Sequence, residues 1–149
     1  MIRLLDTLIE NRNMVQPHHG NNLHTAHGGN VLKWMDEVGA MSAMRFAGKP
    51  CVTAHINQVD FERPIHVGDT VFIRAYVYEA GRTSVRVRIK AFREDPLTGK
   101  REKTTESFFV YVAIDESHQP TGVPTLEVLD DQEMTLREEA IADAPDRGH

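Results

Sequence analysis

The sequence predicts an α+β domain in which an antiparallel sheet curls around one long helix. Two observations carry this prediction. Residues 28–47 contain no proline and many apolar side chains, which favours a helix of several turns. The segments after them alternate apolar and polar residues with a period of two, and short turns separate them, as is typical of antiparallel strands. At 149 residues the chain has the size of one such domain.

The chain before the helix gives weaker signals. Residues 1–15 fit either a short helix or a strand, and residues 16–22 form a loop because they are rich in proline, glycine and asparagine. The helix is expected to begin near Gly28 and to stop at the glycine and proline of residues 48–50.

Four strands are predicted after the helix. They lie at residues 52–59, at 70–79, within 79–95 after a turn at Ala80 and Gly81, and at 105–115. In the third, the apolar face comprises Val85, Val87, Ile89 and Ala91, and the opposite, solvent-facing side comprises Arg86, Arg88 and Lys90. The segment 105–115 is the most apolar, and we expect it to be the central strand.

The chain past Pro124 is acidic, and one short surface helix is expected around residues 131–142, followed by a loose end. We therefore expect one domain at residues 1–125 and an acidic C-terminal helix and tail at 126–149. The tail is predicted to be dispensable for chemistry.

Composition excludes several classes of protein. A net charge of −5 and an isoelectric point near 5.9 give no general attraction to nucleic acid or to an anionic membrane. The single cysteine, Cys51, excludes an intrachain disulfide and a cysteine-based metal cage. No run has the apolarity of a membrane span or of a secretory signal. We expect a cytoplasmic protein without nucleic-acid or membrane partners.

Two adjacent carboxylates stand in the middle of the predicted helix. At 100° per residue, Glu37 shares a polar stripe with Asn30 and Lys33 and is expected to face water. Asp36 instead falls on a stripe of small and apolar residues, made of Leu32, Ala40, Ala43 and Ala47. A carboxylate there is partly desolvated and needs hydrogen bonds or a nearby cavity.

Asp36 is therefore a candidate catalytic group. Desolvation raises the pKa of carboxyl groups in general and makes the ionised form a better base, which suits acid–base chemistry near neutral pH. Spacing alone leaves an alternative open, in which Asp36 bonds a neighbouring loop or lies at a subunit boundary.

Residues at the helix start add a second candidate feature. The backbone N–H groups of Gly28 and Gly29 could stabilise negative charge that develops on a carbonyl oxygen, although a glycine pair can equally be only a helix entry. Asn21 precedes them in a loop, where its amide could orient a water or a carbonyl group. The nearby histidines match no metal-binding spacing, and we expect no metal.

Several segments together resemble the hotdog-fold acyl-CoA thioesterases, in particular their acyl-CoA hydrolase branch. They are "NNLHTAHGGNVLKWMDEVGAMSAMRFAG", "VTAHINQVDFERPIHVGDTV", "EAGRTSVRVRI", "FFVYVAID" and the "VP" at residues 123–124. The resemblance covers about residues 17–125. It implies a sheet wrapped around a central helix, hydrolysis of acyl-CoA to fatty acid and CoA, and no cofactor, since coenzyme A is part of the substrate. It also implies dimers with active sites at the subunit interface, often as trimers of dimers (hexamers).

By position, the resemblance assigns Asn21 as the catalytic asparagine, Asp36 as the catalytic acid, and Gly28 and Gly29 as the glycines that address the thioester carbonyl. The expected mechanism has the N–H of Gly29, or of its neighbour, polarising the carbonyl, Asn21 of the facing subunit holding the carbonyl or the water, and Asp36 acting as a base. Direct attack by Asp36 to give an anhydride stays open. The chain departs from the family at His24, where many relatives have glycine.

Binding of the polyanionic CoA moiety requires local positive charge on this acidic protein. The resemblance points to Arg82, Thr83 and Ser84 in the G-R-T-S turn. Charge alone points to Lys100, Arg101 and Lys103 in the next turn, which we interpret instead as a solvated hairpin tip.

Two other functions compete with thioester hydrolysis. An enoyl-thioester hydratase or dehydratase of the same fold would pair His24 or His27 with Asp36, and a non-enzymatic acyl-CoA-binding protein would bind without releasing thiol. Cys51 is expected to be a small buried residue rather than a nucleophile. Ordinary packing is expected for Trp34, Met35, Met41 and Met44, and acyl chain length is left open.

Overall fold

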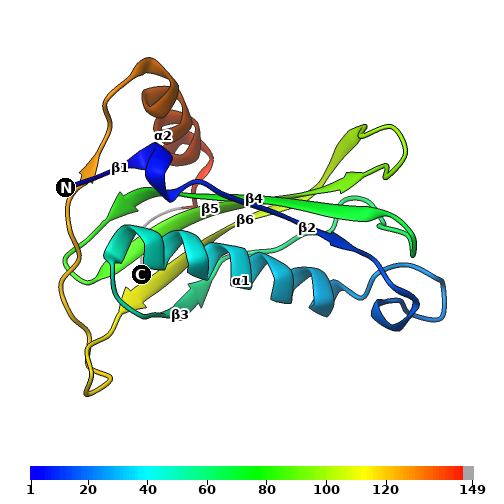
Figure 1. Ribbon diagram of the computed structural model, residues 1–149, viewed down its shortest axis with the longest axis horizontal. Coiled ribbons are helices and arrows are strands. Elements are labelled where there is room, and N and C mark those ends of the chain that lie inside the picture. Colours follow the sequence, from blue (N-terminus) through cyan, green and yellow to red (C-terminus); the bar gives the residue numbers. More distant parts are fainter. Residues whose placement is uncertain (146–149) are drawn as a thin grey trace.

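The computed structural model describes residues 1–145. Its elements are β1 (Ile2–Arg3), the 3-10 turn η1 (Leu4–Thr7), β2 (Ile9–Met14), the 3-10 turn η2 (Pro17–His19), α1 (Gly28–Ala47), β3 (Cys51–Ile56), β4 (Thr70–Ala80), β5 (Ser84–Glu94), β6 (Arg101–Ala113), β7 (Leu126–Glu127) and α2 (Asp131–Asp143). Figure 1 shows α1 lying along the inner side of the sheet and α2 on the outer side.

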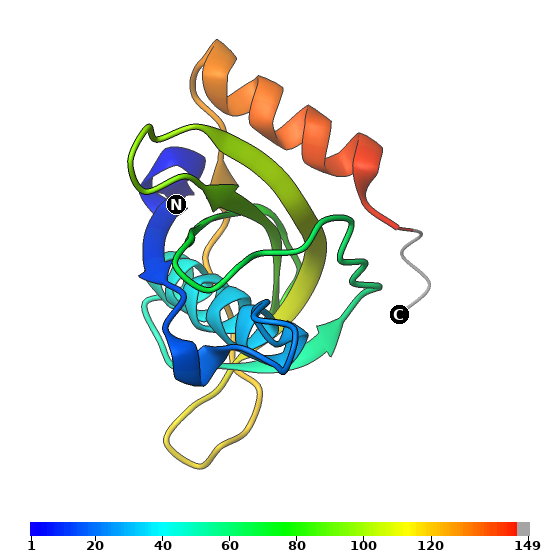
Figure 2. The ribbon, with the colours of Figure 1, turned by 90° about the vertical axis from the view of Figure 1, so that its right-hand side faces the viewer.

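The main sheet has five strands in the order β2-β4-β5-β6-β3, and all neighbouring pairs are antiparallel. Viewed end-on in Figure 2, the sheet curves around α1. Apolar side chains from α1 and from the inner face of the sheet form one core, in which Val38 and Ile89 have no exposed surface. The predicted α+β class, with an antiparallel sheet around one long helix, is confirmed.

The predicted helix at residues 28–47 is confirmed as α1, and its end has a clear local cause. Gly48 adopts a left-handed backbone with a φ of 67°, and its N–H donates to the carbonyl of Met44. On the sheet, the predicted apolar face of β5 is confirmed, because Val85 and Val87 are fully buried.

Three expectations about the strands are wrong. The most apolar strand, β6, is interior but not central, and β5 occupies the centre. The outer face of β5 is also not fully wet, because Arg88 is buried and pairs with Glu106 at 2.9 Å and with Asp143 of α2 at 2.6 Å. Although charged residues alternate with apolar ones along β5, the strand is therefore covered on both faces. β3 also ends at Ile56, earlier than residue 59.

Helix α2 is fastened to the start of the chain. Glu133 has no exposed surface, and its carboxylate accepts hydrogen bonds from the Arg3 guanidinium at 2.9 Å and from the N–H of Leu5 at 2.8 Å. The Arg3 hydrogen bond is the largest cause that lowers the pKa of Glu133, and with the Leu5 N–H it brings the pKa to about 2, although burial of the acid acts in the opposite direction. The segment at 131–143 is thus held onto the domain.

The division at residue 125 stays a prediction, and the end of the expected tail, 146–149, lies outside the described residues. Within residues 1–145 no helix has the length and apolarity needed to span a membrane.

Candidate active site

Asp36 lies two turns into α1 and is half-buried, while its neighbour Glu37 is exposed. This confirms the interpretation of the two carboxylates from their helical spacing. The Asp36 side chain is oriented by two hydroxyl groups from different strands. Thr53 of β3 donates to Oδ1 at 2.7 Å, and Tyr111 of β6 lies 3.0 Å from the same oxygen.

Tyr111 is fully buried, and its hydroxyl also lies 3.1 Å from the backbone carbonyl of Asp36. Burial, followed by the nearby Asp36 carboxylate, raises the pKa of Tyr111, so the phenol stays protonated and remains a donor. Within residues 1–145 the structure gives Oδ2 of Asp36 no hydrogen-bond partner. One oxygen of the carboxylate is thus held, and the other is open.

The start of α1 carries the predicted glycine pair. The first helix-forming hydrogen bonds are donated by Asn30 and Val31 to the carbonyl of His27. The N–H groups of Gly28 and Gly29 precede these bonds and have no acceptor inside the helix. A Cβ atom on Gly29 would meet nothing within 4 Å, so the space on that side of the residue is open.

A pocket of about 380 Å³ lies beside this helix start. Its walls come from the end of the 20–27 loop, the first turn of α1 and residues 61–65. The Phe61 ring closes in on Gly28, where a Cβ atom would be only 3.2 Å from the ring. A small residue at the helix start therefore allows the pocket wall to approach the helix.

Asn21 organises the loop before the helix. Its Oδ1 accepts hydrogen bonds from the N–H groups of Leu23 and Thr25, and its Nδ2 donates to the Thr25 hydroxyl at 2.8 Å. A carboxamide has two N–H donors, so one remains for a substrate oxygen or a water. His24, the departure from the family pattern, has a φ of 60°, a conformation that glycine adopts without strain.

The predicted CoA-binding turn lies at the other end of α1. The carbonyl of Arg82 accepts from the N–H of Val123, and the neighbouring Gly122 carbonyl accepts from Lys49, just past the end of the helix. Figure 1 shows the β4–β5 turn at this end of the sheet and the 17–27 loop at the opposite end. At a rise of about 1.5 Å per residue, the two ends of α1 are roughly 30 Å apart. Residues 82–84 therefore cannot serve the helix start of their own chain.

The second basic turn is occupied by internal pairs. Arg101 pairs with Glu94 at 3.0 Å and stacks 3.9 Å from the Phe72 ring centroid, and Lys103 pairs with Glu106 at 3.1 Å. Lys100 is exposed. This agrees with the interpretation of the turn as a solvated hairpin tip.

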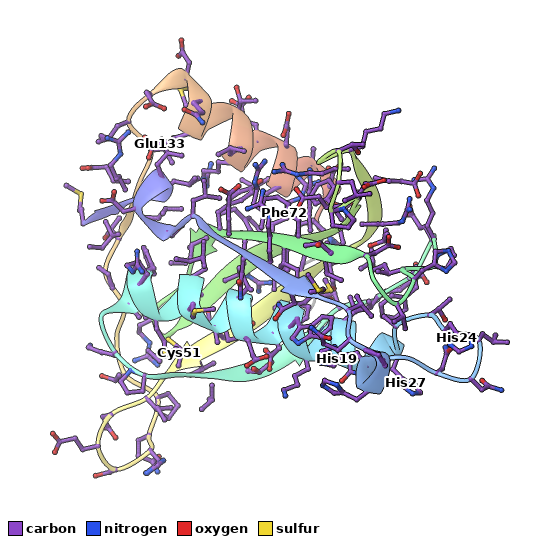
Figure 3. All side chains as sticks on the ribbon, turned by 45° about the vertical axis from the view of Figure 1, so that its right-hand side comes forward. His19, His24, His27, Cys51, Phe72 and Glu133 are labelled. Carbon is purple, nitrogen blue, oxygen red and sulfur yellow. The ribbon has the colours of Figure 1, made fainter. Side chains whose placement is uncertain are left out.

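Within residues 1–145 the structure shows no hydrogen bond from His24 or His27 to Asp36. Figure 3 shows His24 and His27 at the loop end of α1 and Cys51 toward the other end. Burial raises the pKa of Cys51 to about 11, which keeps the thiol protonated at neutral pH. In the part of the chain that the structure describes, no group of three or more His, Cys, Asp or Glu side chains could hold a metal ion.

The edge strand β3 leaves apolar side chains in solvent. Val52 and Ile56 are 47% and 38% exposed, and the nearby face of α1 exposes Met41 and Met44. Trp34 and Met35 are buried, as expected for ordinary packing. The same expectation is wrong for Met41 and Met44, which are partly exposed. The opposite edge strand, β2, instead carries charged side chains, such as Glu10 and Arg12, which oppose edge-to-edge pairing.

Thr53 and Tyr111 are the site residues that sequence reasoning missed. A tyrosine within the most apolar strand was the available signal, because a buried hydroxyl requires a hydrogen-bond partner. For Thr53 no local signal existed, since its contact depends on where β3 pairs with β6.

The curled sheet, the central helix and its half-buried, hydrogen-bonded carboxylate define a thioester hydrolase of the hotdog fold. The chain belongs to the thioesterase superfamily, which matches residues 23–100. It is 34% identical over 127 residues to an uncharacterized acyl-CoA thioester hydrolase of Bacillus subtilis, covering 85% of this chain and 74% of that protein.

Two groups of solved structures share the fold. The acyl-CoA hydrolase of Staphylococcus aureus, solved with butyryl coenzyme A, coenzyme A and coenzyme A disulfide, is 31% identical with a TM-score of 0.85, covering 94% of this chain and 85% of that one. A hexameric acyl-CoA thioesterase in its apo form is 38% identical with a TM-score of 0.85, covering 95% and 92%.

Three further structures of the Staphylococcus aureus hydrolase are variants in which an asparagine, an aspartate or a threonine is replaced by alanine. Those three positions are separated by the same numbers of residues, 15 and 17, as Asn21, Asp36 and Thr53 of this chain. The third position coincides with the threonine that donates to Asp36.

Proposed function

We propose that the protein hydrolyses acyl-CoA to a free fatty acid and CoA, with Asp36 activating the attacking water at a site shared by two protomers. The observation that carries this proposal is the state of the Asp36 carboxylate, which is half-buried, held at Oδ1 by Thr53 and Tyr111, and open at Oδ2. A carboxylate that is fixed in direction and free at one oxygen is suited to accept a proton from a bound water.

The reaction proceeds by addition and elimination. Oδ2 of Asp36 takes a proton from water while the water oxygen bonds to the thioester carbon. The carbonyl oxygen gains negative charge, which the N–H of Gly29 and the remaining N–H of Asn21 stabilise. The carbon–sulfur bond then breaks, CoA leaves as a thiolate, and the proton held by Asp36 passes to the thiolate, which restores the Asp36 carboxylate.

The geometry of one chain favours a site drawn from two. Asn21 and Gly29 belong to the loop and the start of α1, whereas about 10 Å of helix separates Gly29 from Asp36. We therefore assign Asn21 and Gly29 to one protomer and Asp36 with Thr53 to its partner. This modifies the expectation from the sequence, in which only Asn21 came from the facing subunit.

The assembly follows from the unprotected edge of the sheet. Pairing of β3 with the same strand of a second copy would cover Val52 and Ile56 and enclose Thr53. Such a dimer can place the Arg82–Ser84 turn of one protomer near the helix start of the other, where CoA phosphates need positive charge. A trimer of these dimers, a cytoplasmic location and the need for no cofactor complete the proposal.

The test is thiol release from acyl-CoAs of increasing chain length, which also defines the chain-length preference. Asp36→Asn is expected to lower kcat by at least about 100-fold, the contribution of a general base. Glu37→Gln is the matched control, because it removes an adjacent exposed carboxylate and should keep the parent kcat. Parent turnover in Asp36→Asn would refute the proposal.

A further inference from the structure

The carboxylate of Asp36 has two unequal oxygens, and Tyr111 is a source of the inequality. We propose that Tyr111 is a positioning residue that acts through Asp36: its hydroxyl, with that of Thr53, holds Oδ1 so that Oδ2 alone faces the reacting water. This inference rests on the proposed function of Asp36 but adds a residue to it. Tyr111 itself touches no substrate.

The first support is the geometry around Oδ1. Hydroxyl donors of Thr53 and Tyr111 approach this one oxygen at 2.7 and 3.0 Å from two different strands. An ionised carboxylate accepts hydrogen bonds at both oxygens, so two donors on Oδ1 fix the plane of the group and leave the lone pairs of Oδ2 for a third partner.

The second support is the rigidity of the donor. Tyr111 has no exposed surface and belongs to β6, which pairs with β5 on one side and β3 on the other. The ring stacks on Phe109 with a centroid distance of 6.2 Å. A donor fixed by packing within its own chain holds its acceptor precisely.

The third support is the space left for the hydroxyl. Gly39 lies one turn after Asp36 in α1, and a Cβ atom there would overlap with the Tyr111 oxygen and lie 2.5 Å from Cδ1 of Ile89. The helix therefore carries a glycine at the one place where the phenol must approach the backbone.

The decisive experiment removes only the hydroxyl. Tyr111→Phe keeps the ring, and thiol release is measured with a good acyl-CoA substrate. Loss of a hydrogen bond to a charged group is expected to lower kcat by about 10- to 100-fold. KM should change less than twofold, since Tyr111 contacts no substrate.

Tyr76→Phe is the matched control. The Tyr76 hydroxyl is also buried and donates to the backbone carbonyl of Leu136 at 2.7 Å, but on the α2 side of the sheet. Both variants should lose a similar amount of thermal stability, and only Tyr111→Phe should lose turnover. If kcat followed the melting temperature equally in both, Tyr111 would be a structural residue and the inference would be wrong.

A second pair of variants tests whether Tyr111 acts through Asp36. In an Asp36→Asn background, adding Tyr111→Phe is expected to leave the residual rate unchanged, because the oriented carboxylate is already gone. If Tyr111→Phe lowered kcat in the Asp36→Asn background by the same factor as in the parent, the inference would be wrong. Full turnover in Asp36→Asn alone would refute the proposed function instead, so the two failures are distinct.

Discussion

Gly39 lies directly against the hydroxyl group of Tyr111, so closely that a Cβ atom at residue 39 would overlap with the phenol oxygen. The contact joins the middle of α1 to β6 without an intervening side chain. It brings the Tyr111 hydroxyl to both the backbone and the side chain of Asp36, which lies one helical turn earlier. The packing of α1 against β6 and the orientation of the Asp36 carboxylate therefore both depend on the space left by the missing side chain of Gly39.

Gly39→Ala is expected to destabilise the protein by about 1–3 kcal/mol, the usual cost of forcing a methyl group into a packed core. Turnover should fall as well, because the Tyr111 ring has to move away from Asp36. Chemical denaturation and thiol release measure the two effects. Gly29→Ala, where a Cβ meets nothing within 4 Å, controls for stability, and equal stability of the two variants would contradict the packing argument.

Mixing of inactive protomers tests the shared site. Asn21→Ala and Asp36→Asn are each expected to be nearly inactive alone. If a site takes Asn21 from one protomer and Asp36 from the other, each mixed dimer has one intact site. Random assembly of equal amounts then restores about a quarter of the parent activity. No restoration after co-refolding would place both residues in one protomer.

The exposed edge of β3 is expected to hold the dimer together. Val52→Lys replaces an exposed apolar side chain on the free edge of β3 by a charged one. Charged side chains oppose the pairing of one sheet edge with another. Sedimentation velocity should show dissociation to monomers, and thiol release should fall in parallel. Leu97→Lys, at a hairpin tip where the side chain is 93% exposed, should leave both unchanged. Active Val52→Lys monomers would disprove the interface.

Acid should loosen α2 through Glu133. Its folded pKa of about 2 lies below the ordinary value of 4.5, so its ionised form stabilises the folded state above about pH 4.5. This stabilisation is lost as the pH falls from there towards 2. Glu133→Gln should therefore show a smaller decrease in the free energy of unfolding between pH 6 and 3, as measured by urea denaturation. Asp131→Asn, an exposed acid in the same turn, should behave like the parent.

Much of the fold was predictable because its signals are local. Helix α1 has a proline-free apolar stripe and a glycine stop, and the strands have a period of two. The central position of β5 was missed because Arg88 looks solvent-facing in the sequence, and only α2 shows why it is buried. The order of strands in a sheet depends on such contacts between segments that lie far apart in the sequence.

The candidate site divides in the same way. Helical spacing alone placed Asp36 on the apolar side of α1 and Glu37 in water. Helical spacing could not identify Thr53 and Tyr111, which lie 17 and 75 residues away in the sequence and meet Asp36 only when β3 and β6 pair. Residues that carry a charge can thus be found from the helix, whereas the neutral groups that orient them depend on strand register.

The edge strand β3 has a consequence for how the enzyme responds to its own concentration. One strand has a free edge in the sheet and also supplies the Thr53 hydroxyl to Asp36. In the proposed dimer, subunit dissociation and loss of turnover are then one equilibrium. Specific activity should fall on dilution below the dimer Kd, and a substrate analogue that spans both protomers should lower that Kd by mass action.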